Sequence, residues 1–129
     1  MVLKIYTDGG SRGNPGKAAC SFIVVENNEI IKKYSEFLGI KTNNEAEYNA
    51  IIKALEYIKD NEVEVFSDSE LVVKQLNGEY KITKEHLREL NEKINILTNN
   101  RKVKFANVKR ENKFIEQADL LVNKELDKH

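Results

Sequence analysis

Two aspartates lie where predicted strands end, at positions suited to a catalytic or metal-binding carboxylate. Asp8 follows a strand predicted over residues 2–7, and Asp68 follows a strand predicted over 63–66. If these strands are parallel neighbours, both side chains emerge at the same carboxyl edge, where open α/β sheets place their sites. Taken singly, either residue is equally well explained as a turn residue or a helix N-cap.

Two further carboxylates, Glu47 and Asp119, fall on the apolar, sheet-facing stripes of predicted helices. Glu47 lies in line with Ile51, and Asp119 lies in line with Val122. Burying an unpaired carboxylate costs several kcal/mol, so each side chain needs a cation, a hydrogen-bonding partner or a proton. The alternative to a functional site is a buried ion pair, for which Lys4 is a candidate partner.

Together the four carboxylates predict a metal centre. Carboxylates at close range repel one another unless cations neutralise them. Ligand sets made only of oxygen select Mg²⁺ or Mn²⁺ over zinc, and substrate phosphate and water complete the shell of Mg²⁺. Two such ions in one site are suited to in-line displacement at phosphorus. The residues therefore indicate a metal-dependent phosphodiesterase, with two ions per active site when substrate is bound.

The elements that must position these residues indicate an α/β fold. Alternating apolar residues and turn chemistry predict three strands in an antiparallel meander, with turns at 13–16 and 27–28. A strand that follows a helix is joined by a right-handed crossover and is therefore parallel. We expect a five-stranded mixed sheet, three strands antiparallel and then two parallel, with helices on both faces. Strands are predicted over 2–7, 18–25, 30–38, 63–66 and 103–108, and helices over 44–59, 71–76, 84–97 (capped by Thr83) and 115–126.

Composition limits the class of protein. The chain has 129 residues, of which 40% are hydrophobic, so we expect one globular domain over residues 1–129. With 21 basic and 21 acidic residues the net charge is zero, and a polyanionic partner must be held by a local patch. The single cysteine, Cys20, excludes a disulfide framework and favours the cytoplasm. No apolar run is long enough to cross a membrane, and the first ten residues are not a signal peptide.

Four segments, in order and over nearly the whole chain, resemble type 1 ribonuclease H. Residues 6–16 (YTDGGSRGNPG) resemble the family's opening segment, and 42–48 (TNNEAEY) resemble its TNNxAE element. Residues 67–69 (SDS) match its third element, and 110–112 (REN) followed by 118–119 (AD) resemble its last. One such motif is weak evidence, whereas four in register are specific.

The resemblance implies an enzyme that hydrolyses the RNA strand of RNA/DNA hybrids and leaves 5′-phosphate and 3′-hydroxyl ends. By position, Asp8, Glu47, Asp68 and Asp119 match the family's metal-binding catalytic carboxylates. One metal would prepare a water nucleophile, and the other would stabilise the leaving 3′ oxygen. The family fold is the five-stranded mixed sheet already expected.

The resemblance also implies substrate contacts. The glycine-rich turn and the glutamate would read the 2′-hydroxyl, asparagines would contact the strands across the minor groove, and a threonine would hold a phosphate. A plain hairpin and a capping asparagine are the alternative explanations of the turn and of the asparagine pair. The implied contacts are Gly10, Ser11, Arg12, Asn14, Thr42, Asn43, Asn44, Ser69, Glu70 and Arg110.

The chain departs from many family members in three ways. The loop before Asp119 carries Arg110 and no histidine, which resembles the archaeal-like and plant-like subgroup. Residues 75–87 lack the basic, tryptophan-bearing protrusion, and no separate hybrid-binding domain is expected. The main cations left are Arg12, Lys17 and those of the stretch 101–113, which could equally be a solvated strand edge. We therefore expect weak binding through few phosphates.

The sequence is also compatible with two other functions. The chain could be a related nuclease that cuts double-stranded RNA or RNA–DNA junctions, or a nucleic-acid-binding module without activity. Four carboxylates argue against the binding module, because negative charges do not help to bind phosphate. The expected partner is an RNA/DNA hybrid, with no membrane association and no obligate protein partner, and the protein is expected to be a monomer.

Overall fold

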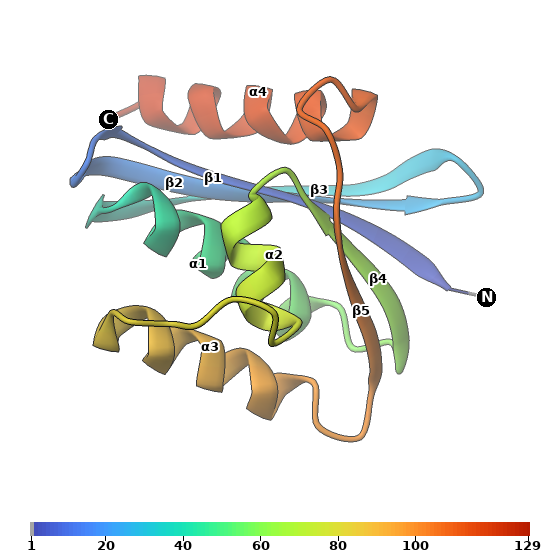
Figure 1. The fold of residues 1–129 in the computed structure, drawn as a ribbon. Coiled ribbons are helices and arrows are strands. Elements are labelled where there is room, and N and C mark those ends of the chain that lie inside the picture. Colours follow the sequence, from blue (N-terminus) through green and yellow to red (C-terminus); the bar gives the residue numbers. More distant parts are fainter. Residues whose placement is uncertain (1) are drawn as a thin grey trace.

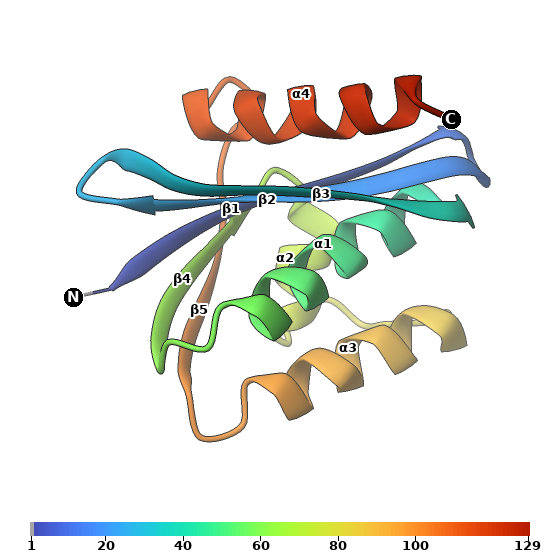
Figure 2. The same cartoon turned by 180° about the vertical axis from the view of Figure 1, so that it is seen from behind.

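The computed structural model describes residues 2–129 and contains one five-stranded sheet with helices on both faces. The strand order is β3-β2-β1-β4-β5, so β1 lies in the centre, antiparallel to β2 and parallel to β4. Helix α4 covers one face alone, and the other three helices lie on the opposite face (Figures 1 and 2). This architecture confirms the predicted fold. The elements are β1 (Leu3–Gly13), β2 (Gly16–Glu26), β3 (Glu29–Lys41), α1 (Asn43–Tyr57), β4 (Glu62–Ser67), α2 (Glu70–Leu76), α3 (Glu85–Leu97), β5 (Lys102–Asn107) and α4 (Lys113–Asp127).

The central strand β1 is longer than predicted, and this changes the place of Asp8. Because β2 continues to pair with β1 as far as Gly13, Asp8 lies within the strand instead of at its end. Parallel pairing with β4 stops earlier, at Tyr6 and Phe66. Asp8 and Asp68 each lie two residues beyond this last pair, so the expectation that they share one edge is correct.

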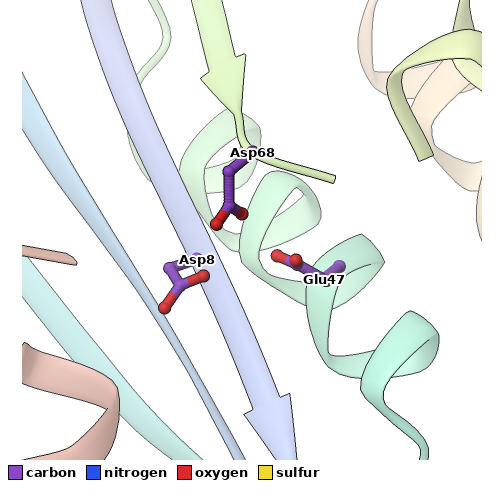
Figure 3. Close-up of side chains that lie close together, drawn as sticks. All are labelled: Asp8, Glu47 and Asp68. Carbon is purple, nitrogen blue, oxygen red and sulfur yellow. The ribbon is translucent and has the colours of Figure 1, made fainter. Parts of the chain in front are cut away.

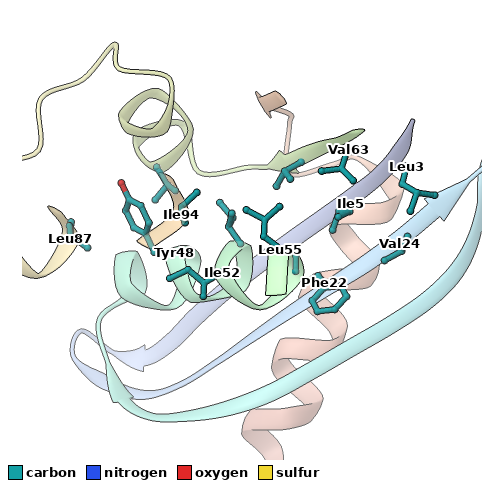
Figure 4. Close-up of a cluster of buried hydrophobic side chains, with 14 residues drawn as sticks. Leu3, Ile5, Phe22, Val24, Tyr48, Ile52, Leu55, Val63, Leu87 and Ile94 are labelled. Carbon is teal, nitrogen blue, oxygen red and sulfur yellow. The ribbon is translucent and has the colours of Figure 1, made fainter. Parts of the chain in front are cut away.

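Alternation along β1 divides the core into two layers. Ile5 points toward α1 and joins a cluster that includes Phe22, Leu55 and Ile94 (Figure 4). Tyr6 points the other way and packs with Phe114 of α4. Successive side chains of a strand face opposite sides of the sheet, so one strand holds both helical layers in fixed relation to the site.

Two helix N-caps differ from the predictions. Thr42 caps α1 in a capping box, in which Thr42 Oγ1 accepts from Glu45 N and a Glu45 carboxylate oxygen accepts from Thr42 N. Neither Asn43 nor Asn44 is the cap. Lys84, not Thr83, is the N-cap residue of α3, and it makes no side-chain capping bond. The capping box fixes the first turn of α1, which carries the expected TNNxAE segment.

Arg101 connects the ends of two helices to the start of β5. Its guanidinium donates to the carbonyl oxygens of Leu55 at 3.2 Å, Ile58 at 2.7 Å and Leu97 at 3.3 Å, and twice to that of Asp60. Carbonyl groups at a helix C-terminus lack intrahelical partners, and this side chain satisfies several of them. Arg101 is therefore a structural cation and not part of a phosphate-binding surface.

The basic stretch expected over 101–113 does not form one surface. Lys102 and Lys104 lie on β5 directly opposite Glu62 and Glu64 of β4. Cross-strand neighbours of opposite charge form a balanced, solvated sheet face. Strand β5 ends at Asn107, and in the segment that follows it Arg110 lies beside Asp68. No helix within residues 2–129 has the length and apolarity needed to span a membrane.

Candidate active site

Three carboxylates converge where β1 passes the end of β4. Asp8 comes from β1, Glu47 from α1 and Asp68 from the residues that follow β4, and an oxygen of each lies within 4.8 Å of the others. Figure 3 shows the three side chains close together beside β1. Three of the four predicted carboxylates are thus brought into one cluster.

Gly9 allows the backbone of α1 to pack in direct contact with β1. A Cβ at this position would lie 2.3 Å from the carbonyl carbon and oxygen of Ala46 and 2.6 Å from the backbone nitrogen of Glu47. No side chain fits at such distances, so the helix backbone packs directly on the strand. The sequence predicts that the glycine-rich turn contacts the substrate; at Gly9 the group in close contact is the protein's own helix.

Glu47 has one carboxylate oxygen that is buried without a hydrogen-bond partner. Its Oε1 is inaccessible and forms no hydrogen bond within residues 2–129. Burial, followed by the nearby charges of Asp8 and Asp68, raises the pKa of Glu47 well above its ordinary value. The alternative of an ion pair with Lys4 is wrong, because Lys4 is exposed and lines a separate pocket beside the β2–β3 turn.

Asp8 has a similar environment. Its exposed fraction is 4%, and burial together with the charges of Asp68 and Asp119 raises its pKa to about 8. At neutral pH this cluster therefore holds protons unless another positive charge replaces them. Shifts of this kind are common at functional sites.

Arg110 lies beside the third carboxylate. Its Nε is 3.3 Å from Oδ2 of Asp68, and its side chain is 82% exposed. The carboxylate of Asp68 raises the pKa of Arg110. Within residues 2–129 this is the only ion pair made by the four predicted carboxylates.

Asp119 does not lie on the buried face of its helix, where the apolar pattern predicted it. The buried face of α4 is formed by residues that include Ala118 and Val122, and Asp119 is exposed. It nevertheless lines the same cleft as Asp8 and Glu47, a cleft of about 250 Å³. The prediction of a buried Asp119 is wrong, and its place beside the other carboxylates agrees with the predicted role.

Six of the predicted substrate contacts line this cleft, and they come from the glycine-rich turn, the start of α1 and the loop before α4. They are Gly10, Ser11, Arg12, Asn43, Asn44 and Arg110. Asn43 joins the first two of these elements, because its Oδ1 accepts from Ser11 N at 2.7 Å and its own N donates to Asn14 Oδ1 at 3.0 Å.

The other predicted contacts have partners within the protein. Thr42 caps α1, and Ser69 caps α2 by accepting from Val72 N. Glu70 accepts from the hydroxyl of Tyr80 at 3.0 Å, and it lies 3.8 Å from Nζ of Lys74. The structure thus gives Thr42 and Ser69 capping roles, as their residue types allow. Their contacts with substrate stay predictions.

Comparison with known proteins identifies the family. A family model described as RNase H matches residues 2–127. The chain belongs to the RNase H family. Ribonuclease HI of Halobacterium salinarum is 38% identical over 127 residues, which span 95% of this chain and 63% of that relative. This similarity makes the chain a type 1 member of the family.

Solved structures agree with the assignment of this RNase H family chain. The crystal structure of RNase H1 from the halophilic archaeon Halobacterium salinarum NRC-1 matches it with a TM-score of 0.93 at 34% identity, over 100% of both chains. The crystal structure of LC11-RNase H1 in complex with an RNA/DNA hybrid matches it with a TM-score of 0.90 at 39% identity. That match covers 98% of this chain and 97% of the other; LC11-RNase H1 was isolated from compost by a metagenomic approach.

In this RNase H family chain the carboxylate cluster fits a divalent cation. The three converging side chains offer only oxygen ligands, and one of these oxygens, Oε1 of Glu47, is buried without any partner. A hard cation such as Mg²⁺ or Mn²⁺ prefers this ligand type. The orphaned oxygen is the observation that a hydrogen-bonded or ion-paired core would not produce.

Two positioning features were not predicted from the sequence. Gly9 was included among the turn glycines, but its packing on Ala46 depends on the tertiary fold. Asn123 lines the cleft and donates to the main-chain oxygen and the carboxylate of Asp119. The signal that could have found Asn123 is its spacing, four residues after Asp119 on the same helical face.

Proposed function

We propose that the protein is a metal-dependent endoribonuclease that hydrolyses the RNA strand of RNA/DNA hybrids and leaves 5′-phosphate and 3′-hydroxyl ends. The observation that carries the proposal is the cluster of three converging carboxylates beside a cleft, in which Oε1 of Glu47 is buried without a hydrogen-bond partner. Membership of the RNase H family supports it, as does the similarity to LC11-RNase H1, whose structure holds a hybrid.

We propose that two divalent cations, Mg²⁺ or Mn²⁺, bind with the substrate to Asp8, Glu47, Asp68 and Asp119. When bound, such cations neutralise the carboxylates, activate a water molecule and stabilise the leaving 3′ oxygen. The protein's own contribution is a ligand set that is already assembled. Asp8 and Glu47 are held by the contact between β1 and α1, so little reorganisation accompanies binding.

Selection of RNA is assigned to groups around the cleft. A 2′-hydroxyl distinguishes RNA from DNA, and we propose that the Gly10–Ser11 segment and Glu47 contact it, with Ser69 and Glu70 nearby. Asn44 lines the cleft and has no side-chain hydrogen bond within residues 2–129, so its amide is free for a base or sugar. Asn14 and Asn43 are proposed to contact the strands beside it, and Thr42 a phosphate.

Arg110 is proposed to contact a substrate phosphate. Its guanidinium is largely exposed and has one partner, Asp68. Once cations neutralise Asp68, the guanidinium becomes available for a phosphate oxygen, for which its planar fork is well suited. A cytoplasmic location and a monomeric state stay predictions.

The test is a panel of four substrates of one sequence, namely an RNA/DNA hybrid, duplex RNA, duplex DNA and an RNA–DNA junction. Each is incubated with the protein and either Mg²⁺ or Mn²⁺. We expect cleavage of the RNA strand of the hybrid, with 5′-phosphate on the products. Cleavage confined to duplex RNA or to the junction would identify a related nuclease, and binding without cleavage would contradict the proposed activity.

A further inference from the structure

The amide of Asn123 connects Asp119 to the glycine-rich turn. Asn123 Nδ2 donates to the main-chain oxygen of Asp119 at 3.1 Å and to its Oδ2 at 3.4 Å. On the other side, Arg12 Nη2 donates to Oδ1 and to the main-chain oxygen of Asn123, both at 3.4 Å. The amide thus faces a carboxylate with its donor and a guanidinium with its acceptor, which is the one orientation that satisfies both neighbours.

Arg12 is itself held in place. Its Nη2 lies 2.7 Å from Oδ1 of Asp127, near the end of α4. Arg12 belongs to β1, so the ion pair ties the β1–β2 turn to α4 across one side of the cleft. Asp127, Arg12, Asn123 and Asp119 form a continuous chain of contacts that ends at a carboxylate beside Asp8.

Asp119 needs such support more than the other carboxylates do. Asp8 is fixed by burial, Glu47 by the packing of α1 on β1, and Asp68 is paired with Arg110. Asp119 is exposed and makes no ion pair within the part of the chain that the structure describes. Ordering a free side chain costs conformational entropy when a ligand binds, and a partner that orders it beforehand reduces that cost.

A neutral amide suits this task. A lysine or arginine in its place would also hold the carboxylate, but its charge would compete with a divalent cation for it. The Asn123 amide donates one hydrogen bond and leaves the negative charge intact. Groups that orient metal ligands from behind in this way commonly change metal affinity when they are removed.

We propose that Asn123, oriented by Arg12, is a positioning residue that holds the Asp119 carboxylate toward Asp8 and so sets the affinity of the cluster for its divalent cation. This inference rests on the proposed function in assigning Asp119 to the metal site. It gives Arg12 a role in ordering the site, and the contact of Arg12 with substrate stays a prediction.

The test measures Mn²⁺ binding to the full chain by electron paramagnetic resonance, without nucleic acid. Asn123→Leu keeps the shape of the side chain and removes the amide, and we expect about 10-fold weaker binding. Asn95→Leu is the matched control, because Asn95 makes the same kind of contact to Asn91, four residues earlier, on the remote helix α3. It should bind Mn²⁺ as the wild type does. Arg12→Leu should weaken binding by about 3-fold, less than Asn123→Leu.

A double variant separates positioning from a general structural effect. If Asn123 acts through Asp119, adding Asn123→Leu to Asp119→Asn should change Mn²⁺ affinity no further. The Mg²⁺ concentration needed for half-maximal hybrid cleavage should rise in Asn123→Leu, with the rate recovered at saturating Mg²⁺. Wild-type Mn²⁺ affinity in Asn123→Leu, or a further loss in the double variant, would overturn the inference.

The two proposals fail separately. A wild-type protein that binds Mn²⁺ but does not cleave hybrids would contradict the proposed function, while the Mn²⁺ affinities would still decide the role of Asn123. A wild type that cleaves hybrids, with an Asn123→Leu variant identical to it in both measurements, would contradict only the positioning role.

Discussion

Gly9 and Ala46 are in direct backbone contact, and this contact places Glu47 next to Asp8. A Cβ on Gly9 would lie 2.3 Å from the main-chain carbon and oxygen of Ala46. Helix α1 can therefore meet β1 only where the strand carries a glycine. Asp8 directly precedes Gly9 and Glu47 directly follows Ala46, so the packing contact and the chemical site are built from the same few residues.

Gly9→Ala should destabilise the protein, because the added methyl group forces α1 away from β1. We expect a loss of about 3 kcal/mol in the free energy of unfolding, measured by urea denaturation. Gly10→Ala is the matched control, since its Cβ would meet Val122 at 3.7 Å, an ordinary contact. The control should lose less than about 1 kcal/mol. Equal losses in the two variants would show that the packing of α1 does not depend on Gly9.

The metal-free protein should lose stability as the pH rises, because Asp8 has a pKa of about 8 in the folded state. Its unfolded value is near 4. A raised folded pKa favours the folded state below about pH 4, and this contribution is lost as the pH rises through about 8. Asp8→Asn removes the effect, so in a chelator the variant should be more stable than the wild type at pH 8, by on the order of 3 kcal/mol.

Urea denaturation at pH 5 and pH 8 checks this expectation. The advantage of Asp8→Asn should be larger at pH 8, and saturating Mg²⁺ should reduce it, because a cation bound to the folded state stabilises the wild type. If Asp8→Asn stabilises the protein equally at both pH values, the pKa of Asp8 is not raised in the folded state.

The sequence predicts the sheet well because period-2 alternation and turn residues are local signals. The end of β1 was predicted too early, since Gly9 and Gly10 favour a break in the strand when considered alone. In the fold they pair with Cys20 and Ala19 of β2. Cross-strand pairing, which no local pattern records, keeps the strand intact past Asp8.

The sequence predicted which residues form the candidate site more reliably than it predicted their burial and their partners. An apolar stripe on a helix does not fix which of two adjacent residues lies at its margin, and in α4 Ala118 is buried where Asp119 was expected to be. Arg101 was predicted to be a surface cation, because its main-chain partners Leu55 and Ile58 lie 46 and 43 residues away in sequence. Such contacts leave no signature in a single sequence.

Arg110→Ala should weaken hybrid binding through the loss of one phosphate contact. In a background that cannot cleave, such as Asp8→Asn, the slope of log affinity against log salt should fall by about one unit. The Asp8→Asn protein that retains Arg110 should have a slope that corresponds to only about three or four phosphates. Fluorescence anisotropy with a labelled hybrid at several salt concentrations measures both slopes.

Lys104→Ala is the control for this experiment. Lys104 lies opposite Glu64 on the balanced face of β4 and β5, so its removal should leave the slope unchanged. If Arg110→Ala and Lys104→Ala reduce the slope equally, the affinity depends on total charge, and Arg110 makes no specific phosphate contact.

The central claim is that the carboxylate cluster performs the cleavage, and single-turnover hydrolysis of a labelled RNA/DNA hybrid by Asp68→Asn tests it most directly. This substitution keeps the shape of the side chain and removes the charge that the cluster offers to a cation. With Mg²⁺ at a fixed concentration, the account predicts that the rate of RNA cleavage falls by about 1,000-fold or more, while circular dichroism and hybrid binding show a folded protein. Hydrolysis by Asp68→Asn at close to the wild-type rate would contradict the account.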